Sequence, residues 1–235
     1  MMICTVCQSE NDEFAVTCKQ CKAFLQDRIP NLNLFETAWG MIESPRASFR
    51  KIAIAEHKNF AVLLFALFGL GLSFAAFWFF ELGDRFSTLL DLIIIGMISG
   101  PGIGILTGVC LAILYHFLAK GAGGKATIRT SIGVLAYSLT PIVVSVFLML
   151  PIELLTFGMY MFTLNPHPYV LKPVSYIILM SLDSLVTLWT IILLTVGSKV
   201  VHQLSWLKAV VLVLVFVTAV SAAFILAVDR MPRIF

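Results

Sequence analysis

Five long apolar runs constrain this chain more than any other feature of its sequence. They are Phe60–Phe80, Leu92–Ala119, Ser131–Ile152, Val174–Gly197 and Ala209–Val228. Each holds about 20 residues or more, which is the length that a helix needs to cross a hydrocarbon layer ~30 Å thick. Asp183 is the only Asp, Glu, Lys or Arg within them. The sequence therefore predicts an all-α integral membrane protein with a bundle of five transmembrane helices.

Composition argues against the alternative, a soluble domain with buried helices. The mean hydropathy is +0.98, and 12% of the residues are charged, whereas soluble domains carry about 25%. Buried helices of a soluble domain would also show a polar stripe, which these runs lack. No cleavable signal peptide is expected, because the first apolar run begins only at Phe60.

The basic residues predict the orientation in the membrane. Of 16 Lys and Arg residues, only four fall on the side reached after an odd number of runs: Arg85, Lys172, Arg230 and Arg233. The positive-inside rule then places the N-terminus in the cytoplasm and the tail, residues 229–235, outside. In a prokaryote this membrane would be the inner membrane. A re-entrant hairpin at Leu92–Ala119, broken at its SGPGIG centre, would change the assignment.

Two Cys-x-x-Cys pairs stand in the first 27 residues, which we call the head. The four thiols are Cys4, Cys7, Cys18 and Cys21. Cytoplasmic thiols stay reduced, so a metal site is favoured over disulfides. So short a segment cannot bury enough apolar surface to fold unaided, and metal binding, worth on the order of 10 kcal/mol in zinc peptides, would supply the missing stability. We therefore predict a structural zinc in a zinc-ribbon-like hairpin.

Three other uses of these thiols were weighed. A redox dithiol is disfavoured, because no βαβ pattern surrounds either pair. Iron in a tetrathiolate site would use the same four ligands. A catalytic zinc needs an open coordination position, which four thiolates do not leave. The fifth cysteine, Cys110, lies inside the second run and is interpreted as a small apolar residue.

Residues 28–59 are predicted to form an amphipathic connector between the head and the first run. One apolar helical face is formed by Leu32, Phe35, Trp39 and Ile42. Ser44-Pro45 ends that helix and starts a basic one, in which Phe49 and Ile52 would be available to the membrane. We expect both helices to lie in the membrane interface. The alternative is a soluble helical pair packed on the head.

The second run carries a glycine at every fourth residue, namely Gly96, Gly100, Gly104 and Gly108. On a helix this spacing makes a smooth groove, along which another helix can approach closely. The partner could belong to the same chain or to a second copy. Pro101 is expected to kink this helix, and a kinked glycine-rich segment could instead line a substrate path.

Asp183 is the polar candidate inside the membrane. Burying a carboxylate there costs about 2.5–3.5 kcal/mol, which makes it a candidate for an ion or proton site. The structural alternative is a protonated Asp183 bonded to neighbouring hydroxyls, and we favour it because a transport path needs more polar groups. Glu153 is expected to reach the outer interface.

Signatures of catalysis are missing from the sequence. His57, His116, His167 and His202 are scattered without a metal-ligand spacing, and no second aspartate pairs with Asp183. The GAGGKATIRT segment has Ala126 where a phosphate loop needs Ser or Thr. No extended basic and aromatic surface points to nucleic acid. The chain is therefore predicted not to be an enzyme.

Three segments together resemble the Yip domain family, the Ypt/Rab-interacting type of five-span membrane protein. They are AWGMIESPRASFRKI before the first run, GGKATIRTSIGVLAYSLTPIVV at the third, and WTIILLTVGSKVVHQLSWLKAV across the fourth and fifth. The second is similar to the family's Tyr-Ser-x-x-Pro helix entry, formed here by Tyr137, Ser138 and Pro141. The likeness covers roughly residues 34–228.

The resemblance implies a cytoplasmic N-terminal region and a five-helix domain over residues 60–228. Eukaryotic members are membrane adaptors for small GTPases. This chain departs from them in lacking an Asp-Leu-Tyr-Gly-Pro signature, with only Gly100-Pro101 in another setting, and in carrying the head. It is similar to the prokaryotic branch, so the GTPase partner is not carried over. Gln8 and Lys22 stand where zinc knuckles often have glycine.

The function expected from these features is a non-enzymatic membrane scaffold, whose head presents a binding surface to a membrane or cytoplasmic protein. The expected partners are the bilayer, such a protein, and possible further copies of the chain. One alternative is a small permease or channel that uses Asp183 and the Gly/Pro-rich second run. A weaker alternative is a lipid-handling protein that perturbs the bilayer through residues 32–58.

Overall fold

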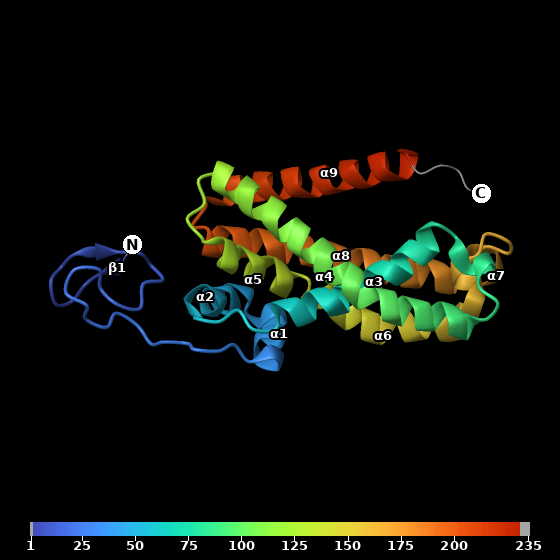
Figure 1. Ribbon diagram of the computed structural model, residues 1–235, viewed down its shortest axis with the longest axis horizontal. Coiled ribbons are helices and arrows are strands. Elements are labelled where there is room, and N and C mark those ends of the chain that lie inside the picture. Colours follow the sequence, from blue (N-terminus) through green and yellow to red (C-terminus); the bar gives the residue numbers. More distant parts are fainter. Residues whose placement is uncertain (1, 231–235) are drawn as a thin grey trace. The chain divides into compact units, whose positions relative to one another are not determined.

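The computed structural model describes residues 2–230, and its elements are labelled in Figure 1. The part of the expected outer tail from residue 231 onward lies outside the described residues. The chain divides into two compact units, which are described separately below. Unit 1 comprises Met1–Asn59, Leu114–Val134 and Leu194–Phe235, and unit 2 comprises Phe60–Ile113 and Leu135–Leu193.

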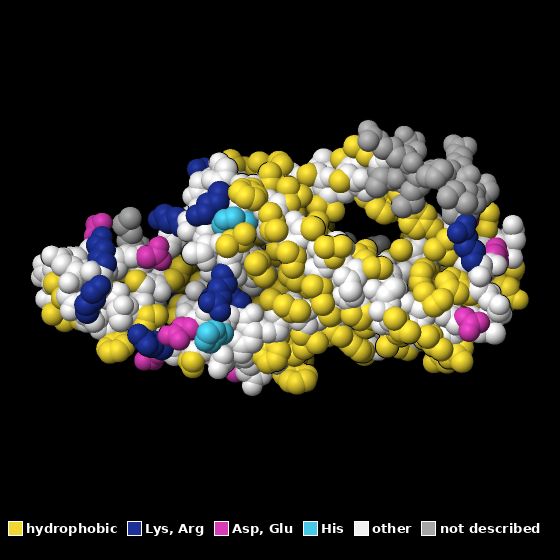
Figure 2. All heavy atoms as spheres, viewed as in Figure 1, with side chains coloured by type: hydrophobic (Ala, Val, Ile, Leu, Met, Phe, Trp, Pro, Cys, Tyr) yellow, Lys and Arg dark blue, Asp and Glu magenta, His cyan; other side chains and the backbone are white. Residues whose placement is uncertain are grey.

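Five helices are long and apolar enough to cross a membrane. Their spans are Ala61–Phe79, Leu89–Gly121, Ile128–Phe162, Pro173–Val201 and Trp206–Leu226. Figure 2 shows many hydrophobic side chains on the visible surface of the helical part of the chain, as expected for helices whose outer surface meets lipid rather than water. The prediction of an all-α multi-pass membrane protein is therefore confirmed.

Unit 1 begins with the head and the connector. A two-stranded antiparallel sheet joins β1 (Met2–Ile3) to β2 (Glu10–Asn11), with Met2 opposite Asn11. The connector forms α1 (Leu34–Glu43) and α2 (Pro45–Ile54). The remaining helical parts are the end of α4 (Leu89–Gly121), the start of α5 (Ile128–Ser138), the end of α8 (Pro173–Val201) and α9 (Trp206–Arg230).

Local chemistry explains where the connector helices begin. The Asn33 side chain accepts a hydrogen bond from the backbone N–H of Glu36 and so caps α1. Pro45 occupies the first turn of α2, where its missing N–H leaves no helical bond unmade. An ion pair of 2.6 Å between Lys51 and Glu36 links the two helices.

One expectation for α2 is wrong. Phe49 and Ile52 were predicted to be available to the membrane, but both side chains are 0% exposed. Phe49 packs where a side chain on Gly197 would stand, and Ile52 packs against Gly133. The apolar face of α2 is therefore covered by protein. The face of α1 is different, because Phe35 and Trp39 remain exposed.

Unit 2 contains α3 (Ala61–Phe79), η1 (Leu82–Arg85), most of α4, α6 (Thr140–Phe157), η2 (Gly158–Phe162), α7 (Pro168–Leu171) and most of α8. Its core is a cluster of buried side chains from α3, α4, α6, η2 and α8: Phe74, Leu92, Phe157, Met161, Phe162 and Leu179. Aromatic rings dominate this cluster, which includes an edge-on contact of Phe74 with Phe77.

Two helices differ in detail from the sequence patterns. α4 runs unbroken through Pro101, so a re-entrant hairpin at Leu92–Ala119 is excluded. The third span is interrupted at Leu139, between α5 and α6, two residues before Pro141. Pro141 has no N–H to donate to the carbonyl of Tyr137 four residues earlier, and the hydroxyl of Thr140 donates to that carbonyl instead.

Candidate functional site

The four cysteines of the head converge in space. Their sulfur atoms all lie within 4.8 Å of one another, and two pairs, Cys4 with Cys21 and Cys7 with Cys18, are each 3.6 Å apart. A tetrahedral zinc ion with Zn–S distances of about 2.3 Å would hold its sulfurs ~3.8 Å apart. The sulfur arrangement therefore fits one tetrahedral metal ion.

Each Cys-x-x-Cys pair forms a knuckle with the same backbone hydrogen bonds. In the first knuckle the N–H of Gln8 donates to the carbonyl of Cys4, and in the second the N–H of Lys22 donates to that of Cys18. Gln8 and Lys22 adopt φ values of 56° and 61°. This left-handed backbone explains why glycine is common there. Gln8 and Lys22 adopt this strained backbone conformation although neither is glycine.

Two polar side chains beside the sulfurs were not singled out in the sequence. The Ser9 hydroxyl lies 3.1 Å from the sulfurs of both Cys7 and Cys18. Asn11 is buried, with its amide nitrogen 3.6 Å from Cys18 and its oxygen accepting from the N–H of Lys19. Such partners orient metal ligands. In the sequence, the only indication of a role for Ser9 and Asn11 is that both lie between the two Cys-x-x-Cys pairs.

Hydrogen bonds also favour the thiolate form of Cys18. The Ser9 hydroxyl and the nearby backbone N–H groups lower the pKa of Cys18 to about 5. A metal ligand must be the thiolate rather than the thiol. The Ser9 hydroxyl and these N–H groups therefore favour the thiolate form of Cys18 at neutral pH.

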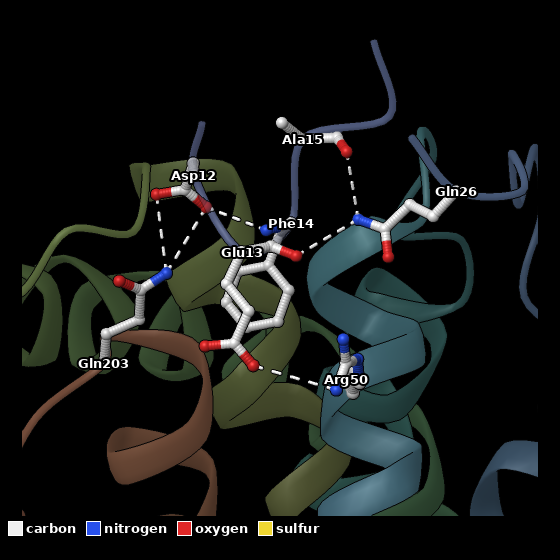
Figure 3. Close-up of polar contacts among 7 residues, drawn as sticks. All are labelled: Asp12, Glu13, Phe14, Ala15, Gln26, Arg50 and Gln203. Atoms are coloured by element: carbon white, nitrogen blue, oxygen red, sulfur yellow. Dashed lines mark hydrogen bonds and ion pairs between the residues drawn. The ribbon is translucent and has the colours of Figure 1, made fainter. Parts of the chain in front are cut away.

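Figure 3 shows how acidic residues of the head contact the helices of unit 1. The carboxylate of Glu13 lies 3.7 Å from the guanidinium of Arg50 in α2. The side-chain amide of Gln203, between α8 and α9, donates to the carboxylate of Asp12. Gln26 donates to the carbonyl groups of Glu13 and Ala15. These contacts are exposed, so they orient the head more than they stabilise it.

Two histidines that are far apart in the sequence meet on one serine in unit 1. Nδ1 of His116 lies 2.9 Å from the Ser131 hydroxyl, and Nε2 of His202 lies 3.3 Å from it. The same hydroxyl is also within hydrogen-bond distance, 3.1 Å, of the carbonyl oxygen of Thr127. His202 is 0% exposed, and burial, followed by the nearby His116 and Lys120, lowers its pKa to about 4.

The glycines of α4 lie against α3 in the same chain. Gly100 and Gly104 face Gly69, while Gly96 and Gly108 lie against the rings of Phe74 and Phe65. Nothing lies within 4 Å of the place where a side chain on Gly102, on the other face of α4, would begin.

Asp183 is half-buried on α8, and it lies beside a second carboxyl group. That group belongs to Glu153, which is only 7% exposed, so the prediction that Glu153 reaches the outer interface is wrong. The hydroxyls of Ser184 and Thr187 donate to helix carbonyl groups. The third apolar run of the sequence ends at Ile152, just before Glu153, whereas the span in the structure extends to Phe162.

Comparison with known proteins gives one match. A family model described as Yip1 domain matches residues 39–228. No curated protein and no solved structure shows a significant match. The matched region begins at Trp39 and includes all five candidate spans, and it leaves out the cysteine head.

Proposed function

The chain belongs to the Yip1 domain family, and from this premise we propose that it is a non-enzymatic membrane scaffold whose metal-stabilised head presents a protein-binding surface. The family and the five apolar spans support a role within a bilayer. The family match leaves out residues 1–38, and the head lies within them. The head is therefore the element that gives this member a partner of its own.

Exposed apolar side chains on the head support a docking role. Ile3, Val6 and Phe24 are 65%, 71% and 74% exposed, which is a large apolar share for a segment of this size. Exposed apolar and aromatic side chains beside charges are typical of protein interfaces. Arg28 lies 6.0 Å from the Phe24 ring and supplies such a charge.

Zinc is the metal that we assign to the head. Four thiolates in a tetrahedral arrangement leave no open position, so the ion would stabilise the fold and take no part in a reaction. Cytoplasmic zinc and reduced thiols are compatible with this chemistry. The positive-inside bias supports a cytoplasmic head and an outer C-terminus.

The connector supports a position at the membrane surface. On α1, Phe35, Trp39 and Ile42 are 84%, 67% and 55% exposed, and they lie at the spacing of one helical face. Such a face can enter the headgroup region with the tryptophan at the interface. The head would then be held close to the bilayer, where it meets membrane proteins or a second copy of the chain.

A matched pair of variants tests the scaffold role. The full chain, purified from membranes after in-cell crosslinking, would be compared with a Val6→Ser, Phe24→Ser variant. We expect the variant to keep one zinc ion per chain and to lose the crosslinked partner. Val170→Ser, at a residue of α7 that is 73% exposed, makes the same kind of change outside the head and should retain the partner. Equal recovery of the partner by the head variant would contradict the proposal.

A permease is the second candidate, because Glu153 and Asp183 form a pair of carboxyl groups inside the spans. Cation and proton flux into liposomes separates the two functions. If the protein is a scaffold, liposomes that contain it should show the same cation and proton flux as liposomes without protein. Flux that is abolished by Asp183→Asn would establish the permease.

A further inference from the structure

Unit 2 contains a cavity of about 860 Å³ between α3, α6 and α8. Its volume lies in the range of sites that bind small organic molecules. The two acids of the spans, Glu153 and Asp183, both line it. The rest of the wall is largely apolar, so these carboxyl groups are its main polar feature.

Glu153 has a carboxyl oxygen that accepts no hydrogen bond. The residue is 7% exposed, and its Oε1 atom, which is fully buried, has no hydrogen-bond partner. A buried carboxyl oxygen left without a donor is costly. Two neighbouring carboxyl groups in an apolar wall cannot both be ionised without a large repulsion, and a cation between them would allow both to carry a charge. Both facts point to a positively charged ligand with hydrogen to donate.

The chemistry of the wall favours an organic cation over a metal ion. Ca²⁺ and Mg²⁺ need about six or more oxygen ligands, whereas the two carboxyl groups of this cavity supply four at most. Trp78 and Tyr176, by contrast, line the same cavity. Aromatic faces attract ammonium groups, and they do so more strongly away from water.

The hydrogen-bonding pattern selects the kind of ammonium group. A primary ammonium carries three N–H donors, enough for both carboxyl groups. A quaternary ammonium has none and would leave Oε1 of Glu153 unpaired. The site should therefore prefer the primary amine.

The apolar lining extends from the acids along the helices for the length of a chain. On α8 the lining reaches from Asp183 to Ile191, 8 positions further along the helix, and on α6 it reaches from Glu153 back to Ile142, 11 positions away. At 1.5 Å per residue these distances are roughly 12 and 16 Å, close to half of the ~30 Å hydrocarbon layer. Phe68, Leu72 and Leu188 lie in this part of the wall. It fits one aliphatic chain of a single leaflet.

We propose that this cavity binds a single-chain amphiphile with a primary ammonium group, which lies between Glu153 and Asp183 while its aliphatic chain follows α6 and α8. A phospholipid with an amine headgroup is a poorer occupant. Its phosphate is close to its ammonium group and would be repelled by the two acids. The ligand class is therefore the simple long-chain amine.

Native mass spectrometry of the full chain in a non-ionic detergent tests the proposal, with dodecylamine as the probe. We expect one dodecylamine per chain and at least tenfold weaker binding of dodecyltrimethylammonium and of dodecanol. Loss of a charge-assisted hydrogen bond in Glu153→Gln or Asp183→Asn should weaken binding about 10- to 100-fold. Glu81→Gln, at an exposed acid of the same unit, makes the matched change and should leave binding unaltered.

A second variant distinguishes loss of the binding site from loss of the fold. Ala75 lines the cavity and is exposed, so Ala75→Phe fills part of it without removing either acid. We expect this variant to melt at the wild-type temperature and to bind dodecylamine at least tenfold more weakly. Equal binding of the amine and the alcohol, or unchanged binding in both the Ala75→Phe and the Glu153→Gln, Asp183→Asn variants, would overturn the proposal.

Discussion

Gly104 of α4 lies so close to Gly69 of α3 that a methyl group on Gly104 would come within 2.4 Å of the Gly69 Cα atom. It would also lie 2.2 Å from the carbonyl oxygen of Phe65. These neighbours are backbone atoms, which cannot rotate away as a side chain does. The two helices can therefore keep this distance only with glycine at both positions.

The first prediction concerns this contact. Gly104→Ala should lower the free energy of unfolding by about 1–3 kcal/mol, because the added methyl group forces the helices apart. Gly102→Ala is the matched control, since its methyl group would meet nothing within 4 Å. The control should be neutral or stabilising by up to about 1 kcal/mol, as alanine favours helix. Thermal unfolding in detergent measures both, and equal melting of the two variants would rule out the contact as a source of stability.

Metal removal should affect the head and leave the spans intact. A chelator is expected to release one zinc ion per chain and to make residues 1–27 sensitive to protease, because so short a segment cannot stay folded without the metal. Far-UV circular dichroism should show the same helix content before and after. Elemental analysis that finds no metal in the purified protein would contradict the assignment.

Glycine at the knuckles should tighten metal binding. Gln8 and Lys22 hold φ values of 56° and 61°, which cost a non-glycine residue about 1 kcal/mol each. Gln8→Gly or Lys22→Gly should therefore raise zinc affinity roughly fivefold in a chelator competition. The same change at Gln20, which is not one of the positive-φ positions, should lower affinity or leave it unchanged. An increase at Gln20 equal to that at Gln8 would exclude backbone strain as the cause.

Acid should destabilise unit 1 through His202. Its pKa is lowered to about 4 in the folded protein, from 6.5, so the unfolded chain binds more protons between these values. The stabilisation from neutral His202 is then complete above pH 6.5 and is lost as the pH falls toward 4. Its size is on the order of 3 kcal/mol. Melting temperatures measured across this range should fall less steeply for His202→Gln, and an identical slope would exclude His202 as the cause.

The sequence predicted the features that depend on local pattern. Run length and hydropathy were enough for the five spans, because the bilayer sets both. The paired Cys-x-x-Cys spacing was enough to predict that the four thiols come together, and their sulfur atoms lie within 4.8 Å of one another. A pattern identifies the apolar face of α2, but it does not say whether lipid or protein covers Phe49 and Ile52.

Contacts between residues that are distant in the sequence could not be predicted from it. Glu153 and Asp183 stand 30 positions apart, and His116 and His202 stand 86 apart. Each pair meets only after separate helices have packed, and no spacing rule links them. The buried Oε1 atom of Glu153 lacks a hydrogen-bond partner only because of how the helices pack around the cavity, which the sequence does not show.

The position of the four thiols has a consequence for biosynthesis. Cys21 precedes Ala61, the first residue of the first span, by 40 residues. At 5–20 residues per second, a ribosome needs roughly 2–8 s to make that interval. The four cysteines are thus synthesised before these five spans, so the head could bind a metal ion while the spans are still being translated. A domain that is already folded resists translocation, which would keep the amino end on the side of the membrane where it was made.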